Sequence, residues 1–337
     1  MGMGSVDALL ILLFILFAAV IPTLIYVVVA YWLDRYEKEP LWLLVVTFLW
    51  GAIPAIVLSL IFELVLDIPV RVLVTGAGAD LVSTVLTAPV IEEMAKAVPL
   101  LGIFLLYRYE FDGLMDGLIY GALVGFGFAM TENIFYYLAA STVGMGELFL
   151  LIVLRGIVFG MNHALFASVT GIGLAYARYT HNRRQGVLAF LAGLAGAIAL
   201  HMAHNFFVSL DSLGLFLTGL LVDWVGVLVW LVLVVWALRV ERRWITEELA
   251  EEVAFGLLPA HHATAAASYR TRLRERWAAW REHGVGRAHR LSDLHNAAAK
   301  LGVLKRQLRR HPASTRDLAQ LKSLRDRVWQ MQAALEE

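Results

Sequence analysis

Two adjacent glutamates and a lysine, Glu92, Glu93 and Lys96, occur in the middle of an apolar stretch between residues 81 and 107. A charged residue at the centre of a membrane helix costs about 2.5–3.5 kcal/mol, so three of them so close together require a compensating reason. Glu92 and Lys96 are one helical turn apart and can pair, whereas Glu93 lies about 100° further around the helix and is not expected to reach Lys96. Such a carboxylate can serve as a general base, but an ion pair that only joins two helices would show the same pattern.

Three later apolar stretches contain further ionisable residues, Glu132, His163 and His201. If each stretch crosses a membrane, these residues and Glu92 fall at a similar depth in four different spans. A single histidine inside a membrane is more often a satisfied hydrogen-bonding group than a ligand. Four convergent glutamates and histidines instead have the chemistry of a zinc site or of a carboxylate–imidazole catalytic site.

The stretch that contains His201 has two further polar residues close by. His201 and Asn205 are four positions apart and share one helix face, whereas His204 points about 60° away from that face. We therefore expect His201 and Asn205 to act together, and His204 to have a smaller role.

The composition indicates a membrane protein. Of the 337 residues, 60% are hydrophobic and only 17% are charged, and apolar runs of 18 residues or more, each long enough to cross a bilayer, recur along the chain. The formal net charge is zero, which gives no electrostatic reason to expect a nucleic-acid partner. The chain has no cysteine, so a thiol nucleophile, disulfides and thiolate metal ligands are excluded.

The apolar runs predict an all-α polytopic fold with about seven transmembrane helices in a domain that covers residues 1–243. The predicted spans are 9–32, 40–66, 81–107, 113–138, 148–176, 187–210 and 215–238. An eighth, re-entrant piece between residues 68 and 86, in addition to the seven spans, is left open.

Basic residues in the connectors predict the orientation in the cell membrane. The odd-numbered connectors and the segment after the last span contain Arg35, Lys38, Arg108, Arg178, Arg183, Arg184, Arg239, Arg242 and Arg243. The even-numbered connectors contain only Arg71. Because positive residues favour the cytoplasmic side, the N-terminus is expected outside and the C-terminus in the cytoplasm.

Small residues predict close packing of the spans that carry the polar groups. Such residues recur every fourth position in the fourth and fifth spans, at Gly113, Gly117, Gly121 and Gly125 and at Gly156, Gly160, Ala164 and Ser168. Ridges of this kind let helix backbones approach closely in lipid. We expect spans three to six to surround a buried polar cavity.

Residues 244–337 differ from the rest of the chain in being rich in arginine, alanine, glutamate and leucine. Leucines at helical spacing on both sides of Pro312 predict a cytoplasmic helical hairpin of coiled-coil type, with Ser314 capping its second helix. No recognisable chemistry is predicted for this region.

The order of these motifs resembles the PrsW family of intramembrane proteases, which is related to the CAAX prenyl endopeptidase superfamily. The resemblance covers about residues 7–243 and rests on an EExxK motif, an FxxxE motif followed by asparagine, a histidine in the fifth span and an HxxxN motif, here Glu92-Glu93-Lys96, Phe128-Glu132-Asn133, His163 and His201-Asn205. Each motif is short, but their placement on successive spans is fairly specific.

The resemblance implies hydrolysis of peptide bonds in membrane-anchored protein substrates, as in the regulated cleavage of an anti-sigma factor. It implies Glu92 as general base with Glu93 as its support or its alternate, and Lys96 as the charge that keeps Glu92 ionised. Glu132, His163 and His201 would hold Zn²⁺ or the attacking water, and Asn205 would stabilise either the oxyanion or His201. The metal is a hypothesis here, because the chain has no HExxH motif.

Two other classes of function stay open at this point. A proton- or cation-coupled transporter would also place glutamate and histidine inside the membrane, although no internal repeat of the Glu92 region is visible. A membrane scaffold without catalytic activity, acting through residues 244–337, is the third alternative. The patterns contain no information on the oligomeric state.

Overall fold

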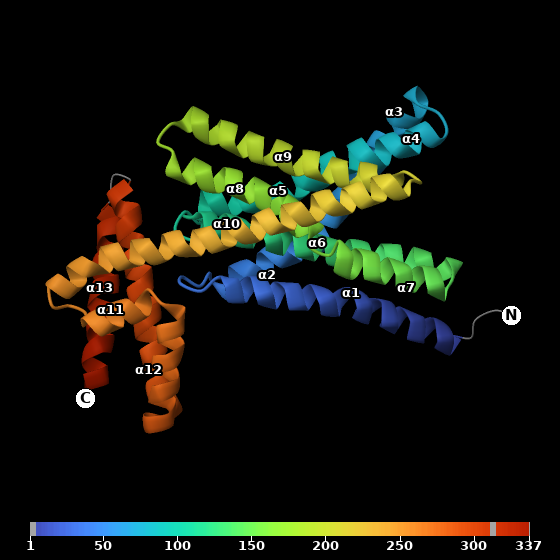
Figure 1. Ribbon diagram of the computed structural model, residues 1–337. Helices are drawn as coiled ribbons and strands as arrows, with labels where there is room; N and C mark the ends of the chain where they lie inside the picture. The colour runs from blue at the N-terminus through green and yellow to red at the C-terminus, as the bar shows by residue number, and fades with distance from the viewer. Residues whose placement is uncertain (1–4, 311–314, 337) are drawn as a thin grey trace. The chain divides into compact units, whose positions relative to one another are not determined.

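The computed structural model describes residues 5–310 and 315–336 (Figure 1). Within these two ranges only helices and their connectors occur, so the predicted all-α class is confirmed. Pro312 and Ser314, on which the predicted break and helix cap rest, lie outside the described residues. The described residues form two compact units: unit 1 comprises those up to Leu33 together with Glu39–Val232, and unit 2 comprises Asp34–Lys38 and those from Leu233 onwards.

Six helical stretches in the described part of the chain are long and apolar enough to cross a membrane, which shows a multi-pass membrane protein. They are Val6–Leu33, Leu41–Leu73, Leu114–Val143, Met145–Tyr179, Arg183–Ser209 and Leu213–Ala254. The predicted third span contains helix α5 (Ala88–Leu106). Helix α5 is not among the six, since it carries Glu92, Glu93 and Lys96, and the count of seven spans stays a prediction.

The helices of unit 1 follow one another along the chain with few residues between them. They are α1 (Ser5–Leu33), α2 (Leu41–Trp50), α3 (Ile56–Leu73), α4 (Ala77–Val82), α5, α6 (Leu114–Val143), α7 (Met145–Val153), α8 (Asn162–Tyr179), α9 (Arg183–Ser209) and the first part of α10 (Leu213–Ala254). Helices α5, α6, α8 and α9 are the ones that carry the polar residues named above, and α5 packs against the other three.

Helix α6 forms the centre of unit 1, where every residue from Met115 to Ala129 is buried. Its glycines allow this close packing. A Cβ atom built on Gly117 would lie 2.4 Å from the carbonyl oxygen of Gly171, and one on Gly125 would lie 2.2 Å from that of His163. The predicted close contact between the fourth and fifth spans is therefore confirmed, and it brings the backbone of His163 directly against α6.

Three π-helical segments interrupt the helices of unit 1: η1 (Gly51–Ala55), η2 (Ser83–Thr87) and η3 (Leu154–Val158). Segment η2 comes directly before α5 and ends two residues before Pro89, which is in the first turn of that helix. Segment η3 contains Arg155 and ends shortly before α8. Segments of this type are frequent at functional sites, and two of the three precede helices that carry candidate site residues.

Unit 2 is a helical bundle made of the end of α10, α11 (Ala260–Ala266), α12 (Tyr269–Arg310) and α13 (Thr315–Glu336). The leucines predicted to form an apolar stripe are buried at Leu291, Leu294, Leu301 and Leu304. Helix α12 packs against both α11 and α13, so the predicted pair of helices is part of a larger bundle. At Gly284 the backbone leaves the helical conformation, with φ 81° and ψ 179°, which glycine adopts readily because it has no Cβ.

Candidate functional site

The three charged residues of α5 form one buried cluster. Glu92, Glu93 and Lys96 are 7%, 1% and 0% exposed. The Lys96 Nζ atom lies 3.2 Å from Oε2 of Glu92, as the four-residue spacing predicts, and also donates to Oε1 of Glu93 at 2.8 Å. The prediction that Glu93 would not reach Lys96 is wrong, because residues three apart are also neighbours on a helix surface.

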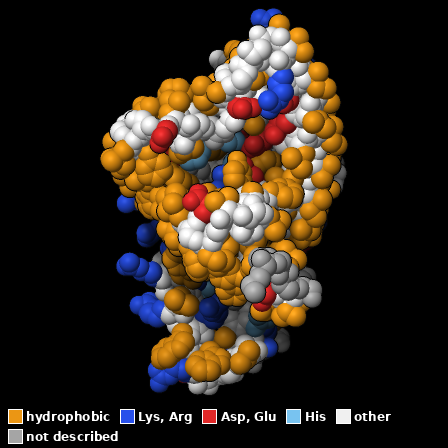
Figure 2. Space-filling model, turned by 90° about the vertical axis from the view of Figure 1, so that its right-hand side faces the viewer, with side chains coloured by type: hydrophobic (Ala, Val, Ile, Leu, Met, Phe, Trp, Pro, Cys, Tyr) orange, Lys and Arg blue, Asp and Glu red, His pale blue; other side chains and the backbone are white. Residues whose placement is uncertain are grey.

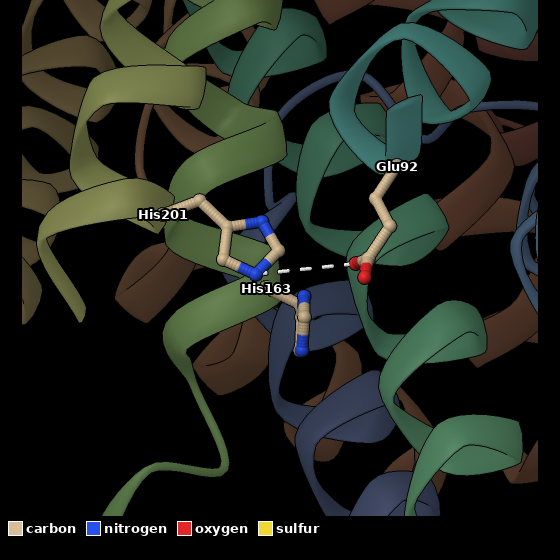
Figure 3. A group of neighbouring side chains, drawn as sticks. All are labelled: Glu92, His163 and His201. Atoms are coloured by element: carbon tan, nitrogen blue, oxygen red, sulfur yellow. Dashed lines mark ion pairs between the residues drawn. The ribbon is translucent and has the colours of Figure 1, made fainter. Parts of the chain in front are cut away.

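Glu93 orients His201, which reaches the cluster from α9. Nδ1 of His201 lies 3.0 Å from Oε1 of Glu93, and Nε2 lies 3.9 Å from Oε2 of Glu92, the pair joined by the dashed line in Figure 3. A carboxylate at one imidazole nitrogen fixes the ring and directs the other nitrogen, a common arrangement around metal-binding histidines. Here the second nitrogen faces Glu92.

His163, in the first turn of α8, lies between Lys96 and Glu132. Nδ1 of His163 is 3.0 Å from the Lys96 ammonium, and Nε2 is 2.8 Å from Oε2 of Glu132. Because an ammonium can only donate, Nδ1 must accept, and the proton of the neutral ring belongs on Nε2, where it is donated to Glu132. His163 thus links the α5 cluster to α6.

Glu132 has a second partner that sequence reasoning did not assign. Nη2 of Arg155, in η3, lies 2.6 Å from Oε2 of Glu132, and Nε of Arg155 donates to the side-chain oxygen of Asn133 at 2.8 Å. An arginine inside an apolar run is itself costly, and that cost was the available signal that Arg155 has a buried partner.

The donor atoms that come together differ in one member from the predicted metal site. One ligand atom from each of Glu92, His163 and His201 lies within 4.8 Å of the others (Figure 3). The predicted set was Glu132, His163 and His201. The structure instead places the Glu132 carboxylate in an ion pair with Arg155, while Glu92 faces the two imidazoles.

Asn205 and His204 are both in α9, but they contact different residues. The side-chain amide of Asn205 donates to the backbone oxygen of Thr84 in η2 at 2.9 Å. Nδ1 of His204 lies 2.7 Å from Oδ2 of Asp223, which also accepts from Asn162 at 3.0 Å. The charge of Asp223 within the last apolar run was the signal, passed over, that α10 contributes to this region.

A cavity of about 770 Å³ lies beside these side chains. Its lining includes Glu63, Glu92, Glu132, Arg155, His163, His204 and Asn205. Figure 2 shows acidic and histidine side chains gathered in a hollow of an otherwise largely hydrophobic face. A cavity with polar side chains is thus present as predicted, but it opens at the surface instead of being buried, and residues outside the predicted spans three to six, such as Glu63, also line it.

The chemistry of this site fits a divalent cation. The carboxylates of Glu63, Glu92, Glu93 and Glu132 gather here together with two cationic side chains, those of Lys96 and Arg155. One oxygen of Glu93, Oε2, is buried without a hydrogen-bond partner among the described residues. Glutamate and histidine are also ligands suited to zinc.

Comparison with known proteins connects this site to a family. The family model described as PrsW family intramembrane metalloprotease matches residues 39–237. Protease PrsW of Oceanobacillus iheyensis is 28% identical over 218 residues, which are 63% of this chain and 91% of that protein. Protease PrsW of Clostridioides difficile is 26% identical over 201 residues, 57% of this chain and 78% of that protein.

A further relative, Protease PrsW of Geobacillus kaustophilus, is 29% identical over 153 residues, and the chain spans 61% of its length. No solved structure matches the chain. The family match covers more than half of the chain and includes every residue of the site described above, and we conclude that the chain belongs to the PrsW family of intramembrane metalloproteases.

Proposed function

We propose that this chain hydrolyses peptide bonds of membrane-anchored proteins and that Glu92, His163 and His201 form its active site. The observation that carries the proposal is that donor atoms of these side chains, from three helices, lie within 4.8 Å of one another beside a cavity of about 770 Å³. Peptide hydrolysis needs an activated water, a group that accepts its proton and stabilisation of the oxyanion. The site offers carboxylate and imidazole groups for each of these tasks.

Zn²⁺ is the metal we propose, held by Glu92, His163 and His201. To bind the ion, His163 would give up one of its two hydrogen bonds, the one to Lys96 or the one to Glu132. When bound, zinc polarises a carbonyl group and makes water more acidic. This assignment exchanges the roles that the resemblance implied for Glu92 and Glu132, because Glu92 faces both imidazoles while Glu132 is paired with Arg155.

Glu132 is then the proton acceptor. Its carboxylate lines the cavity, lies 2.8 Å from Nε2 of His163 and is held in place by Arg155. An arginine pair fixes the direction of a carboxylate. Arg155 therefore acts as a positioning residue for Glu132.

Glu93, Lys96 and Asn205 support the site. Glu93 orients His201, and Lys96 offsets the charges of the two adjacent glutamates. An amide group carries two N–H donors, so the bond from Asn205 to Thr84 leaves one that can face a substrate carbonyl. Of the two roles predicted for Asn205, we propose that of donor to the oxyanion, because its amide is bonded to Thr84.

The substrate class follows from the surroundings of the site. The cavity lies among helices apolar enough to cross a membrane, so a single membrane-spanning protein segment is the substrate we propose, as in regulated cleavage of an anti-sigma factor. The family membership favours proteolysis over transport of a proton or cation. The basic connectors support an N-terminus outside the cell and a C-terminus in the cytoplasm, which reporter fusions after Arg184 and Arg243, both expected to score as cytoplasmic, would test.

The test compares Glu92→Gln with Glu132→Gln in vesicles that contain a single-span reporter substrate. Both variants should lose cleavage by about 10²–10⁴-fold, the usual contribution of a group that handles the proton or the water. Glu92→Gln should also lose bound zinc, whereas Glu132→Gln should retain it. Gln preserves the shape of the side chain, so the fold is expected to survive.

Glu147→Gln is the matched control, because Glu147 is an exposed glutamate at the start of α7, and it should cleave at the wild-type rate. Wild-type cleavage by Glu92→Gln would contradict the proposed site. Retention of zinc by an inactive Glu92→Gln variant would return Glu92 to the role of general base.

A further inference from the structure

A second group of two histidines and a glutamate lies in unit 2, outside the residues that match the protease family. Nδ1 of His262 lies 3.1 Å from Nε2 of His295, and that nitrogen lies 3.5 Å from Oε2 of Glu275. His262 and His295 are 8% and 1% exposed. The two ring nitrogens and the carboxylate oxygen therefore face one another in a largely buried position.

The fold brings these residues together from three helical segments. His262 is in α11, Glu275 is in α12 before Gly284, and His295 is in α12 after Gly284. In a straight helix, residues as far apart as Glu275 and His295 would be about 30 Å apart along the axis. The change of chain direction at Gly284, with φ 81°, allows them to meet.

The separations of the donor atoms match those of a metal site. Zinc binds imidazole nitrogen and carboxylate oxygen at about 2.0–2.2 Å, so two ligand atoms at the corners of a tetrahedron are about 3.3 Å apart. The observed separations of 3.1 Å and 3.5 Å lie on either side of that value. Two imidazoles with one carboxylate form a borderline ligand set that suits zinc and its neighbours among the divalent transition metals.

We propose that His262, His295 and Glu275 form a second metal site, which binds Zn²⁺ or a similar divalent transition-metal ion. The ion connects α11 to both parts of α12 and thus stabilises unit 2. Glu275 is the most exposed of the three, with a side-chain exposure of 24%, so the ion enters from its side. This site is independent of the protease site, because none of its ligands lies in unit 1.

The test is a titration of the full-length chain with Co²⁺ after the protein has been stripped of metal by a chelator. Cobalt replaces zinc in such sites and, in tetrahedral surroundings, gives a strong visible absorption. The titration uses a His201→Ala background, so that the site in unit 1 has lost a ligand. We expect one Co²⁺ per chain, with a tetrahedral spectrum, and excess Zn²⁺ should displace it.

Two substitutions in this background assign the binding to the proposed ligands. Loss of a residue that only supports a metal ligand weakens metal binding by about 10–100-fold. Because His295 is a proposed ligand, His295→Ala should weaken the affinity for Co²⁺ by more than that. Glu275→Gln should change the spectrum and weaken binding, and it keeps a side chain of the same shape in case His295→Ala fails to fold. His289→Ala is the matched control, since His289 is on the same helix but has a side-chain exposure of 78%, and it should leave binding unchanged.

A hydrogen bond between the two imidazoles is the competing explanation for the short distance between His262 and His295. It predicts substoichiometric Co²⁺ in the His201→Ala background, or binding that His295→Ala and Glu275→Gln leave unchanged. Either result would overturn the second metal site, and neither would affect the proposed protease site, whose ligands are different.

Discussion

The two histidine–glutamate clusters of this chain differ in what surrounds them. In unit 1, Glu92, His163 and His201 are accompanied by the charged side chains of Lys96, Glu93, Glu132 and Arg155, and they lie beside a large cavity. In unit 2, the side chains of His262, Glu275 and His295 come together from three helical segments, and the ring of His261 packs against that of His262. The charged residues and the cavity around the cluster of unit 1 suit the catalysis that we propose for it. The proposed role of the cluster in unit 2, which is to connect helices, requires only the metal ligands themselves.

One histidine in each cluster, His163 in unit 1 and His295 in unit 2, is kept neutral, and the cause differs between them. His163 accepts from the Lys96 ammonium, which leaves no room for a second proton on the ring. In unit 2, burial has the largest effect, and His262 and Arg272 add to it; together they lower the pKa of His295 to about 3. Since neutral imidazole is the form that binds metals, a charged neighbour and a buried position lead to the same chemical state.

The largest expected effect separates the two clusters by function. His163→Ala or His201→Ala should reduce cleavage of a single-span reporter by about 10²–10⁴-fold, because each removes a group in contact with the reacting water or its metal. His295→Ala should instead lower the midpoint of thermal unfolding. The measurements are reporter cleavage in vesicles and thermal unfolding in detergent.

The exposed residue His289 provides the control for these changes, and His289→Ala should alter neither cleavage nor unfolding. The distinction between the clusters fails if His163→Ala leaves cleavage intact. It also fails if His295→Ala leaves the unfolding midpoint where it is in the wild-type chain.

A smaller effect on cleavage is expected from a substitution at Gly125, where α6 packs against the backbone of His163. A Cβ atom on Gly125 would lie 2.2 Å from the backbone oxygen of His163, so Gly125→Ala must move α8 away from α6. We expect a destabilisation of about 1–3 kcal/mol, which is usual for overpacking, and a slower cleavage because His163 moves with its helix. Thermal unfolding and reporter cleavage, measured on the same preparation, check both effects.

Gly102→Ala is the control for this substitution. Gly102 is also in a helix of unit 1, but a Cβ atom there would meet nothing within 4 Å. Because alanine favours a helix over glycine by about 1 kcal/mol, this variant should be as stable as the wild type or more stable. Equal behaviour of the two variants would mean that close packing of α6 and α8 does not position the site.

The sequence predicted one pair within a helix and one close approach of two helices, but not which side chains meet across helices. The four-residue spacing correctly paired Glu92 with Lys96, and the glycine ridge of α6 correctly indicated a close neighbour. The contact between Glu93 and His201 depends on how α5 and α9 are rotated, which no spacing within either helix determines. The same is true of the choice between Glu92 and Glu132 as the carboxylate that faces the two histidines.

The cluster in unit 2 could not be predicted from spacing for a different reason. His262, Glu275 and His295 are far apart along the chain, and their meeting depends on the bend at Gly284. A glycine in a helical region is compatible with a continuous helix that carries a modest cost in stability. Only the backbone conformation of that residue shows that the chain turns there.

The smallest expected effect concerns His204, which lies near the protease site but outside its group of donor atoms. His204 lines the cavity, and its Nδ1 lies 2.7 Å from Asp223. In His204→Ala, the hydrogen bond of 3.0 Å from Asn162 to Asp223 can persist, so the start of α8, and with it His163, stays tied to α10. We therefore expect a loss of cleavage of about tenfold or less, at the lower end of what an outer partner contributes, with zinc content unchanged. Metal analysis and reporter cleavage, measured on the same preparation, test this expectation. If His204→Ala loses zinc together with activity, then His204 is itself a metal ligand, and the group formed by Glu92, His163 and His201 is incomplete.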